Sequence, residues 1–359
     1  WSFSLLVFIG IFASILVWNW LNTDELPALA VWVFIGAVLL RLLAGSFWYI
    51  LLPEYGYDNP VNNAGYVMSD AYERDVVAWR LGTSDRPLLD AFTSHQAVDQ
   101  YGGLLFLSAL IYRVLGGEQH YHLMIIVMTA FASGLAVWFT WAFARRLWDR
   151  RIAAYAAVGV ALYPEAILLG SSQMREAITI TLTAAALYGL ARFLKDREMA
   201  GLFWIGSALI LSLPLSYLFT ATLIAVMALF AIGYGQMRML RDWRFWAGIL
   251  VMGAVVLGVI TIFGERLYPG IDSRNPLLIL KEWIAAAGRW HVYFSERGSG
   301  WIQKVFESTP EWTHMLILLG YGIARPFLPA AILDRSNDLW WAIAIWRAVG
   351  WTLLLPFLV

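Results

Sequence analysis

The first twenty residues of the chain carry no charged side chain, and similar apolar runs recur along the whole sequence. A helix of about 20 apolar residues crosses the hydrocarbon core of a bilayer, with a lower limit near 17. Only 14% of the residues are charged, whereas a soluble domain carries roughly 25%. We therefore expect an all-α, polytopic transmembrane helical bundle. The predicted spans, about ten in number, are roughly 1–20, 28–50, 120–144, 152–169, 177–194, 199–213, 216–236, 245–264, 312–333 and 339–358.

Arginine and lysine in short loops set the orientation of the spans. Three basic clusters are separated from one another by two predicted spans each: Arg145, Arg146, Arg150 and Arg151; Arg192, Lys195 and Arg197; Arg238, Arg241 and Arg244. All three therefore fall on one side, which we predict to be the cytoplasm. Parity then places 51–119 and 265–311 outside, as two large outer loops of a single transmembrane domain, 1–359, in the plasma (inner) membrane. Because the sequence starts at Trp1 without a methionine and stops at Val359 inside an apolar run, we expect further parts of the natural protein at one or both ends.

The composition also excludes several classes of function. The formal net charge is zero, which argues against a nucleic-acid partner. The chain has no cysteine, which excludes disulfides and thiolate metal sites. Its five histidines form no recognised metal-binding motif, and it contains no P-loop, GxGxxG, GxSxG or HExxH motif.

The first outer loop contains the segment SDAYERDVVAWRLG (69–82), which predicts a short amphipathic helix. Ser69 is placed to cap this helix, and Asp70 lies in its first turn. Its apolar face comprises Ala71, Val77, Ala78 and Leu81. Spacing alone favours a solvated surface helix with ordinary charges. The apolar run at 101–116 is short and contains Arg113, so we predict a helix along the outer membrane surface, with a short span as the open alternative.

Charged residues also lie at or inside two other apolar runs. Arg175 and Glu176 open a predicted span at its outer end. They are either a simple interfacial flank or, for Glu176, a group facing a cavity shared with the first outer loop. Arg325 lies in an apolar stretch interrupted by Pro326 and Pro329. It is equally well interpreted as a functional residue or as an arginine that lies near a helix end or pairs with a neighbouring acid.

The order of these elements resembles the GT-C superfamily of membrane glycosyltransferases, and within it the protein O-mannosyltransferases and the bacterial lipid A aminoarabinose transferases. The resemblance covers about residues 35–220. It is carried by VLLRLLAG (38–45), SDAYERDVVAWRLG (69–82), YGGLLFLSALIYRVLGG (101–117), FARRLWDRRIAAYAAVGVALYP (143–164) and Glu176.

The sequence departs from the family pattern at several places, and residues 1–20 predict an extra span before the family's first helix. Ala71 follows Asp70 where the family often has a second acid, and Arg74 stands where an aromatic residue is usual. Arg86 and Pro87 replace a pair of prolines ahead of the second surface helix. These departures leave the acceptor and the role of each residue open.

The resemblance implies a glycosyltransferase that moves a hexose or pentose from a polyprenyl-phosphate donor to an extracytoplasmic lipid, glycan or protein acceptor, with inversion. Asp70 would act as the general base, and Glu176 occupies the position of a second acid. The leaving lipid phosphate needs positive charge. The candidates for supplying it are Arg325, Arg74, Arg86 and Arg175. Whether a divalent cation between Asp70 and Glu176 takes part is left open, because family members differ in metal use.

Two other classes of function stay open. One is a transporter or lipid flippase, which typically shows internal repeats and acids near the middle of the membrane. Here the acidic residues gather in outer loops and at the ends of spans. The other is a non-catalytic membrane subunit of a larger complex, which the 20 tryptophans would suit. In an enzyme, Asp70 and Glu176 are expected to converge on one outward-facing cavity.

Overall fold

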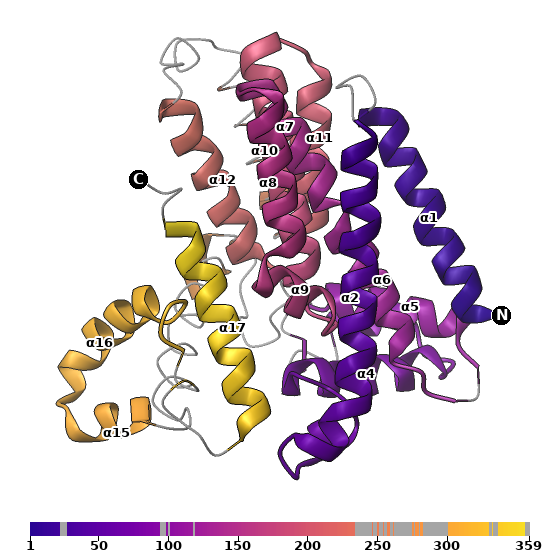
Figure 1. Ribbon diagram of the computed structural model, residues 1–359, viewed down its shortest axis with the longest axis vertical. Helices are drawn as coiled ribbons and strands as arrows, with labels where there is room; N and C mark the ends of the chain where they lie inside the picture. The colour runs from indigo at the N-terminus through magenta and orange to yellow at the C-terminus, as the bar shows by residue number, and fades with distance from the viewer. Residues whose placement is uncertain are drawn as a thin grey trace. The chain divides into compact units, whose positions relative to one another are not determined.

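The computed structural model describes residues 1–21, 27–93, 98–99, 101–117, 119–233, 301–329, 332 and 337–355, together with isolated positions between 246 and 282. Within these residues every regular element is helical, which confirms the all-α prediction (Figure 1). The elements are α1 (Ser2–Leu21), α2 (Ala28–Tyr55), α3 (Pro60–Asn63), α4 (Ser69–Gly82), the 3-10 helix η2 (Leu88–Phe92), α5 (Gly103–Leu115), α6 (Leu123–Gly134), α7 (Ala136–Leu147), α8 (Arg150–Leu162), α9 (Pro164–Gly170), α10 (Glu176–Asp196), α11 (Ala200–Ser212), α12 (Tyr217–Gly233), α15 (Trp301–Ser308), α16 (Glu311–Ala324) and α17 (Asp338–Leu354).

Several of these helices are long and apolar enough to cross a membrane. Four candidate spans are α1, α2, the α6–α7 stretch Leu123–Leu147, and α10. Helices α8 and α9 give a fifth when they are taken together, although they are bent by 50° at their junction. Helices α5, α11 and α12 are apolar but shorter, so the described residues supply fewer full spans than the ten predicted. The predicted span at 245–264 lies outside the described residues, apart from isolated positions.

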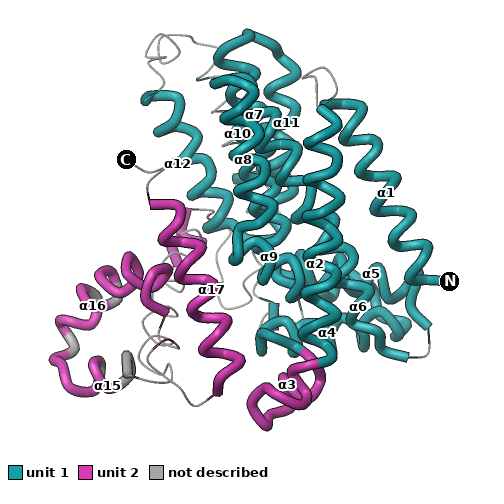
Figure 2. Tube along the Cα trace, viewed as in Figure 1, with its two compact units in different colours: residues 1–50, 66–259 teal, residues 51–65, 260–359 magenta. Residues whose placement is uncertain are grey.

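The chain forms two compact units (Figure 2). The first comprises residues 1–50 and 66–259, and the second comprises residues 51–65 and 260–359. The single transmembrane domain, 1–359, stays a prediction. Most of the predicted outer loop at 265–311 lies outside the described residues.

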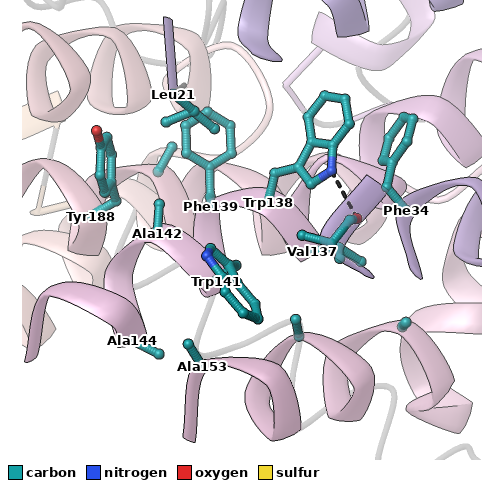
Figure 3. Packing of buried hydrophobic residues seen from close by; sticks show 14 of the residues in the cluster. Leu21, Phe34, Val137, Trp138, Phe139, Trp141, Ala142, Ala144, Ala153 and Tyr188 are labelled. Atoms are coloured by element: carbon teal, nitrogen blue, oxygen red, sulfur yellow. Dashed lines mark hydrogen bonds between the residues drawn. The ribbon is translucent and has the colours of Figure 1, made fainter. Parts of the chain in front are cut away.

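Aromatic and small side chains build the core of the first unit (Figure 3). The Trp138 indole stacks on the Phe34 ring, with the ring centroids 4.1 Å apart, and donates a hydrogen bond of 3.0 Å to the Ala30 carbonyl. Helix α8 contributes buried alanines at every fourth position: Ala153, Ala157 and Ala161. Small residues at this spacing let neighbouring helices approach closely, as is common between helices in membranes.

Helices α10 and α11 approach each other through two glycines. A Cβ atom added at Gly189 would lie 2.6 Å from the Gly201 carbonyl oxygen, and one added at Gly201 would lie 2.4 Å from the Gly189 oxygen. Real Cβ atoms essentially never make contacts this short. The two helices therefore pack backbone against backbone, which fixes the α10–α11 hairpin.

Ion pairs join the two basic turns at one end of the first unit. Arg146, at the end of α7, pairs with Asp196 at the end of α10, and the Lys195 ammonium donates to the Arg146 carbonyl. Arg192 pairs with Glu198 in the α10–α11 turn. The first two basic clusters thus lie at the same end, in agreement with the parity argument. The third cluster lies outside the described residues.

A fully buried arginine occupies the break between α8 and α9. Pro164 has no N–H, so it cannot donate to the Val160 carbonyl as the next turn of a helix would. Instead, the Arg41 guanidinium of α2 donates to the carbonyls of Val160 at 3.4 Å and Ala161 at 3.2 Å. Its Nε atom donates to the Ser133 hydroxyl of α6 at 2.8 Å. Arg41 therefore supplies hydrogen-bond donors that the broken span lacks.

Candidate functional site

Helix α4 is held tightly against α5. A Cβ atom added at Gly82 would lie 2.7 Å from the Tyr112 Cβ atom, so only glycine allows this approach. Arg113 of α5 donates hydrogen bonds to four carbonyls at the end of α4 and in the turn that follows: Leu81, Gly82, Ser84 and Arg86. A cation is favourable at a helix C-terminus, where carbonyls lack partners within the helix. These contacts make the α4–α5 pair a firm platform.

The start of α4 differs from the prediction, whereas the length of α5 agrees with it. The residue that precedes the first turn of α4 is Met68, with extended backbone and no side-chain cap. Ser69 is already helical, so its predicted role as the cap is wrong. Helix α5 has 13 residues, or about 20 Å of helix, which is short of a bilayer core of about 30 Å. This length agrees with a surface helix and disfavours a straight span.

Two charged residues of α4 lie on its buried face. The predicted apolar face includes Ala71, Ala78 and Leu81, and all three are buried. Arg74 and Asp75 lie between them along the same face, with only 5% and 1% of their surface exposed. Burial of an unpaired charge is very unfavourable, so each of these side chains requires its own set of polar partners.

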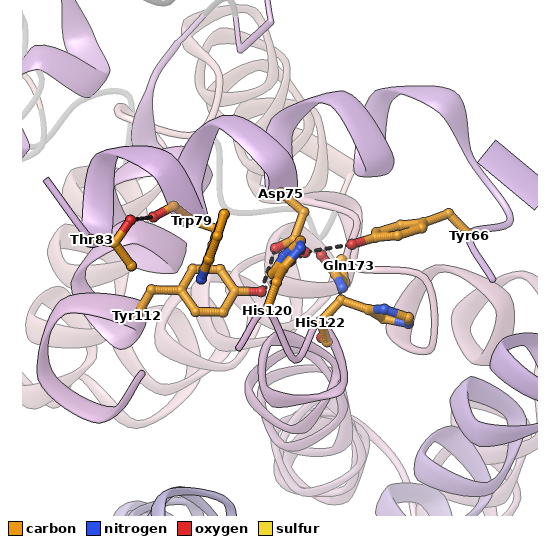
Figure 4. Close-up of polar contacts among 8 residues, drawn as sticks. All are labelled: Tyr66, Asp75, Trp79, Thr83, Tyr112, His120, His122 and Gln173. Carbon is orange, nitrogen blue, oxygen red and sulfur yellow. Dashed lines mark hydrogen bonds and ion pairs between the residues drawn. The ribbon is translucent and has the colours of Figure 1, made fainter. Parts of the chain in front are cut away.

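Asp75 is surrounded by three hydrogen-bond donors (Figure 4). The hydroxyls of Tyr66 and Tyr112 donate to its carboxylate at 2.6 and 2.9 Å, and the Nε2 atom of His120 lies 2.8 Å from it. The ring of His120 stacks on Trp79, with the centroids 5.2 Å apart. Burial, followed by the charge of Asp75, raises the pKa of both tyrosines, so both remain protonated donors.

A second histidine lies on the other side of Tyr66. The ring of His122 contacts the rings of Tyr49 and Tyr66, with centroid distances of 4.9 and 4.4 Å. Burial lowers the pKa of His122 to about 4, so the ring is neutral at physiological pH. Its Nε2 atom has no hydrogen-bond partner among the described residues. Its backbone carbonyl accepts a hydrogen bond of 2.9 Å from the Gln173 side chain.

Gln173 is the centre of the turn that leads into α10. Its φ angle of 55° is left-handed, which is uncommon for a residue other than glycine. Three elements hold the turn in place: Arg74 of α4 donates to the Gln173 carbonyl, Trp48 of α2 donates to the Ser171 hydroxyl, and the start of α6 accepts from the Gln173 amide. Residues held in sparsely populated backbone conformations occur preferentially at functional sites.

This turn presents Arg175 and Glu176, as the sequence suggested. The Arg175 guanidinium lies 5.0 Å from the centre of the Tyr101 ring, and its Nε atom lies 3.5 Å from a Glu176 carboxylate oxygen. About a third of the Arg175 side chain is exposed, so it can reach a ligand. The other oxygen of Glu176 has no hydrogen-bond partner among the described residues. That oxygen atom is buried.

The charges around Arg74 form one electrostatic cluster. Burial lowers the pKa of Arg74, and the positive charge of Arg175 acts in the same direction. The negative charges of Asp99, Glu176 and Asp75 oppose this shift. The structure therefore brings together three of the predicted site residues: Arg74, Arg175 and Glu176. Asp99 is buried beside them and accepts hydrogen bonds from the backbone at the start of α5.

The other predicted residues are exposed. Asp70 lies in the first turn of α4, four residues before Arg74, and Arg86 follows the end of that helix. Arg325 belongs to the second unit, where it is exposed directly after the end of α16. Its role as a phosphate ligand stays a prediction. Among the residues described in both units, no three His, Cys, Asp or Glu side chains are arranged to hold a metal ion.

The sequence-based reasoning missed the polar residues around Asp75. The helical period offered a signal for Arg74 and Asp75, because positions 71, 74, 75, 78 and 81 share one face of a helix. No comparable signal marked His120, since its partner lies 45 positions away.

Searches against protein-family models, curated proteins and solved structures find no match to this chain.

Proposed function

We propose that this chain is a membrane glycosyltransferase of the GT-C type, with about ten spans in the plasma (inner) membrane. It transfers a sugar from a polyprenyl-phosphate donor to a lipid, glycan or protein acceptor outside the cytoplasm, with inversion. One observation carries the proposal: two arginines and a glutamate, Arg74, Arg175 and Glu176, gather at the outer end of α10 beside helix α4. A departing lipid phosphate requires positive charge, which these arginines would supply at the start of α10.

Asp70 is the proposed general base. Its exposure in the first turn of α4 leaves it accessible to an acceptor that arrives from outside. The acceptor hydroxyl gives its proton to Asp70 while its oxygen bonds to the anomeric carbon. The bond from that carbon to the phosphate oxygen breaks, and its electron pair leaves with the phosphate. A single displacement of this kind inverts the anomeric configuration.

Arg175 is the best-placed residue to bind the departing phosphate. Its side chain is one-third exposed and is steadied by the face of Tyr101. Arg74 is almost fully buried, and its hydrogen bond to the Gln173 carbonyl holds the turn that carries Arg175. The carboxylate of Glu176 lies 3.5 Å from the Nε atom of Arg175 and helps to hold this guanidinium in place.

The test is sugar transfer from a labelled polyprenyl-phosphate donor by the purified chain in lipid. Asp70→Asn should reduce transfer about 100-fold or more, because a positioned base contributes this much. Asp85→Asn is the matched control, since Asp85 is an exposed acid in the same outer segment. Transfer that survives in Asp70→Asn would discard this base. An absence of both turnover and donor binding in the unmodified chain would reject the glycosyltransferase.

A second pair of variants tests the phosphate ligand. Arg175→Gln should raise the donor concentration needed for half-maximal transfer and lower the maximal rate, because a charged donor to the leaving group is lost. Arg80→Gln is the control, since Arg80 is an exposed arginine on α4. If both variants behave alike, Arg175 has no special place in the reaction.

One observation favours a second candidate function, a transporter or lipid flippase. Broken spans and buried ionisable residues are typical of transporters. The α8–α9 break and Arg41 have this character. However, Arg41 uses its donors on protein carbonyls and the Ser133 hydroxyl, which is the pattern of a structural brace. Donor flux across vesicles without sugar transfer would favour this candidate.

A further inference from the structure

His120 lies in an environment that the proposed reaction does not yet use. Its Nε2 atom is 2.8 Å from the buried carboxylate of Asp75, and a quarter of its side chain is exposed. Trp79 stacks on one face of the ring, and the edge of Tyr112 approaches it with a centroid distance of 5.4 Å. The ring is therefore fixed in orientation, while part of it faces outward.

The charge of Asp75 argues for a protonated His120. A buried carboxylate is strongly unfavourable unless it is paired as well as hydrogen-bonded. Two of its three donors, the hydroxyls of Tyr66 and Tyr112, are neutral. His120 is the hydrogen-bond partner that can carry a positive charge, and an imidazolium donates through both ring nitrogens.

The Nδ1 atom of a protonated His120 is then a charged hydrogen-bond donor without an assigned acceptor. No hydrogen bond to the His120 Nδ1 atom is formed among the described residues. The site around it is linked to the phosphate-binding turn, because the carbonyl of His122, two residues on, accepts from the Gln173 side chain. Gln173 in turn accepts from Arg74. A charged donor in this place suits a phosphate oxygen.

We propose that His120, held by Asp75, binds the phosphate of the lipid-linked donor and donates a proton to the leaving phosphate oxygen. This inference rests on the proposed function. As the bond between the anomeric carbon and the phosphate oxygen breaks, its electron pair stays on that oxygen. The proton on the Nδ1 atom of His120 moves to the oxygen, and a neutral imidazole remains. Asp75 is a positioning residue, because it keeps the Nε2 proton and aims the ring.

The pH dependence follows from the groups that face His120. These are Asp75 of α4, Tyr112 of α5, Tyr66 before α4, and His122 of the same connecting segment. Both tyrosines remain protonated and His122 remains neutral near neutral pH. A difference in the pH profile between the unmodified chain and His120→Gln therefore isolates the contribution of His120.

The decisive variant is His120→Gln, because a glutamine side chain retains an N–H for Asp75 but has no second ring nitrogen. Binding of farnesyl phosphate to the purified chain in detergent should weaken about tenfold at pH 6.5, the effect of one charged hydrogen bond. The difference between the variant and the unmodified chain should shrink as the pH rises. Tyr121→Phe, at the exposed neighbouring position, is the control.

Several results would overturn the inference. Unchanged farnesyl phosphate binding in His120→Gln would do so, as would equal binding of farnesyl phosphate and inorganic phosphate, which would indicate a site for free phosphate. In the transfer assay, the variant should lose the alkaline limb of the pH profile, whereas loss of the acidic limb would show a base in place of an acid. If farnesyl phosphate binds through His120 but no sugar is transferred, the proposed function fails while the phosphate site stands.

Discussion

Replacing the buried arginine of α2 should destabilise the fold through the break in the α8–α9 span. Arg41→Met keeps the length of the side chain and removes every donor. The carbonyls of Val160 and Ala161 would then lose the guanidinium as a partner in the interior of the first unit. Water cannot replace it inside a membrane-spanning helix.

The magnitude follows from these two carbonyls. An unsatisfied buried acceptor costs about 1–3 kcal/mol, so two cost roughly 2–6 kcal/mol. Removing the buried charge also removes its desolvation penalty, and hydrogen bonds between membrane helices average less than in water-soluble cores. We therefore expect a loss near the lower end, about 2 kcal/mol, and a fall in the unfolding temperature of about 4 °C or more.

A double-mutant cycle with Pro164 isolates the cause. Pro164→Ala restores an N–H that can donate to the Val160 carbonyl when the two helices straighten. In the Arg41→Met background this change should recover part of the lost stability, whereas in the unmodified chain it should have little effect. The coupling between the two changes should be about 1 kcal/mol, well above the value expected for independent sites.

Thermal unfolding in detergent, followed by the fluorescence of the 20 tryptophans, measures all four proteins of the cycle. Two results would refute the reasoning. One is an Arg41→Met protein as stable as the unmodified chain. The other is strict additivity of the two changes, which would mean that Arg41 stabilises the protein by some route other than the α8–α9 break.

Three further predictions follow. Gly170→Ala should lower the unfolding temperature, because its Cβ would lie 2.9 Å from the buried arginine side chain of α2; Gly159→Ala, with nothing within 4 Å, should not. Because the chain has no cysteine, a membrane-impermeant maleimide should label Asp85→Cys in intact cells but Arg150→Cys only after permeabilisation, and the reverse pattern would reject the predicted orientation. The pKa of His122 is about 4 in the folded protein and 6.5 in the unfolded chain. The neutral ring therefore stabilises the fold fully above pH 6.5, and the free energy of unfolding falls by roughly 3 kcal/mol between pH 6.5 and pH 4. His122→Phe should flatten this pH dependence in acid titrations.

The apolar runs predicted much of the first unit, because a membrane span is a strong and local signal. The predicted spans at 1–20, 28–50, 120–144 and 177–194 correspond to helices that are long enough to cross a bilayer. The predicted span at 152–169 is a bent pair of helices. Pro164 is the local reason for that bend, and its position in the sequence was a usable signal.

The polar site was harder to predict, because each partner of its buried charges is distant in sequence. Arg41 was visible only as a charge inside an apolar run, and its acceptors lie about 120 positions away. Arg74 and Asp75 could have been assigned to the buried face of α4 from the helical period. A helix that buries two adjacent opposite charges without pairing them to each other needs hydrogen-bond acceptors for the cation and separate donors for the anion.

The structure supplies those two sets from different elements. Arg74 turns to the strained backbone of Gln173, and Asp75 turns to two tyrosines and His120. A purely structural need would be met more simply by apolar residues, since replacing buried charges with well-packed apolar side chains often increases stability. The two buried charges beside the partly exposed Arg175 fit the proposed site, in which a phosphate is bound and a proton is transferred.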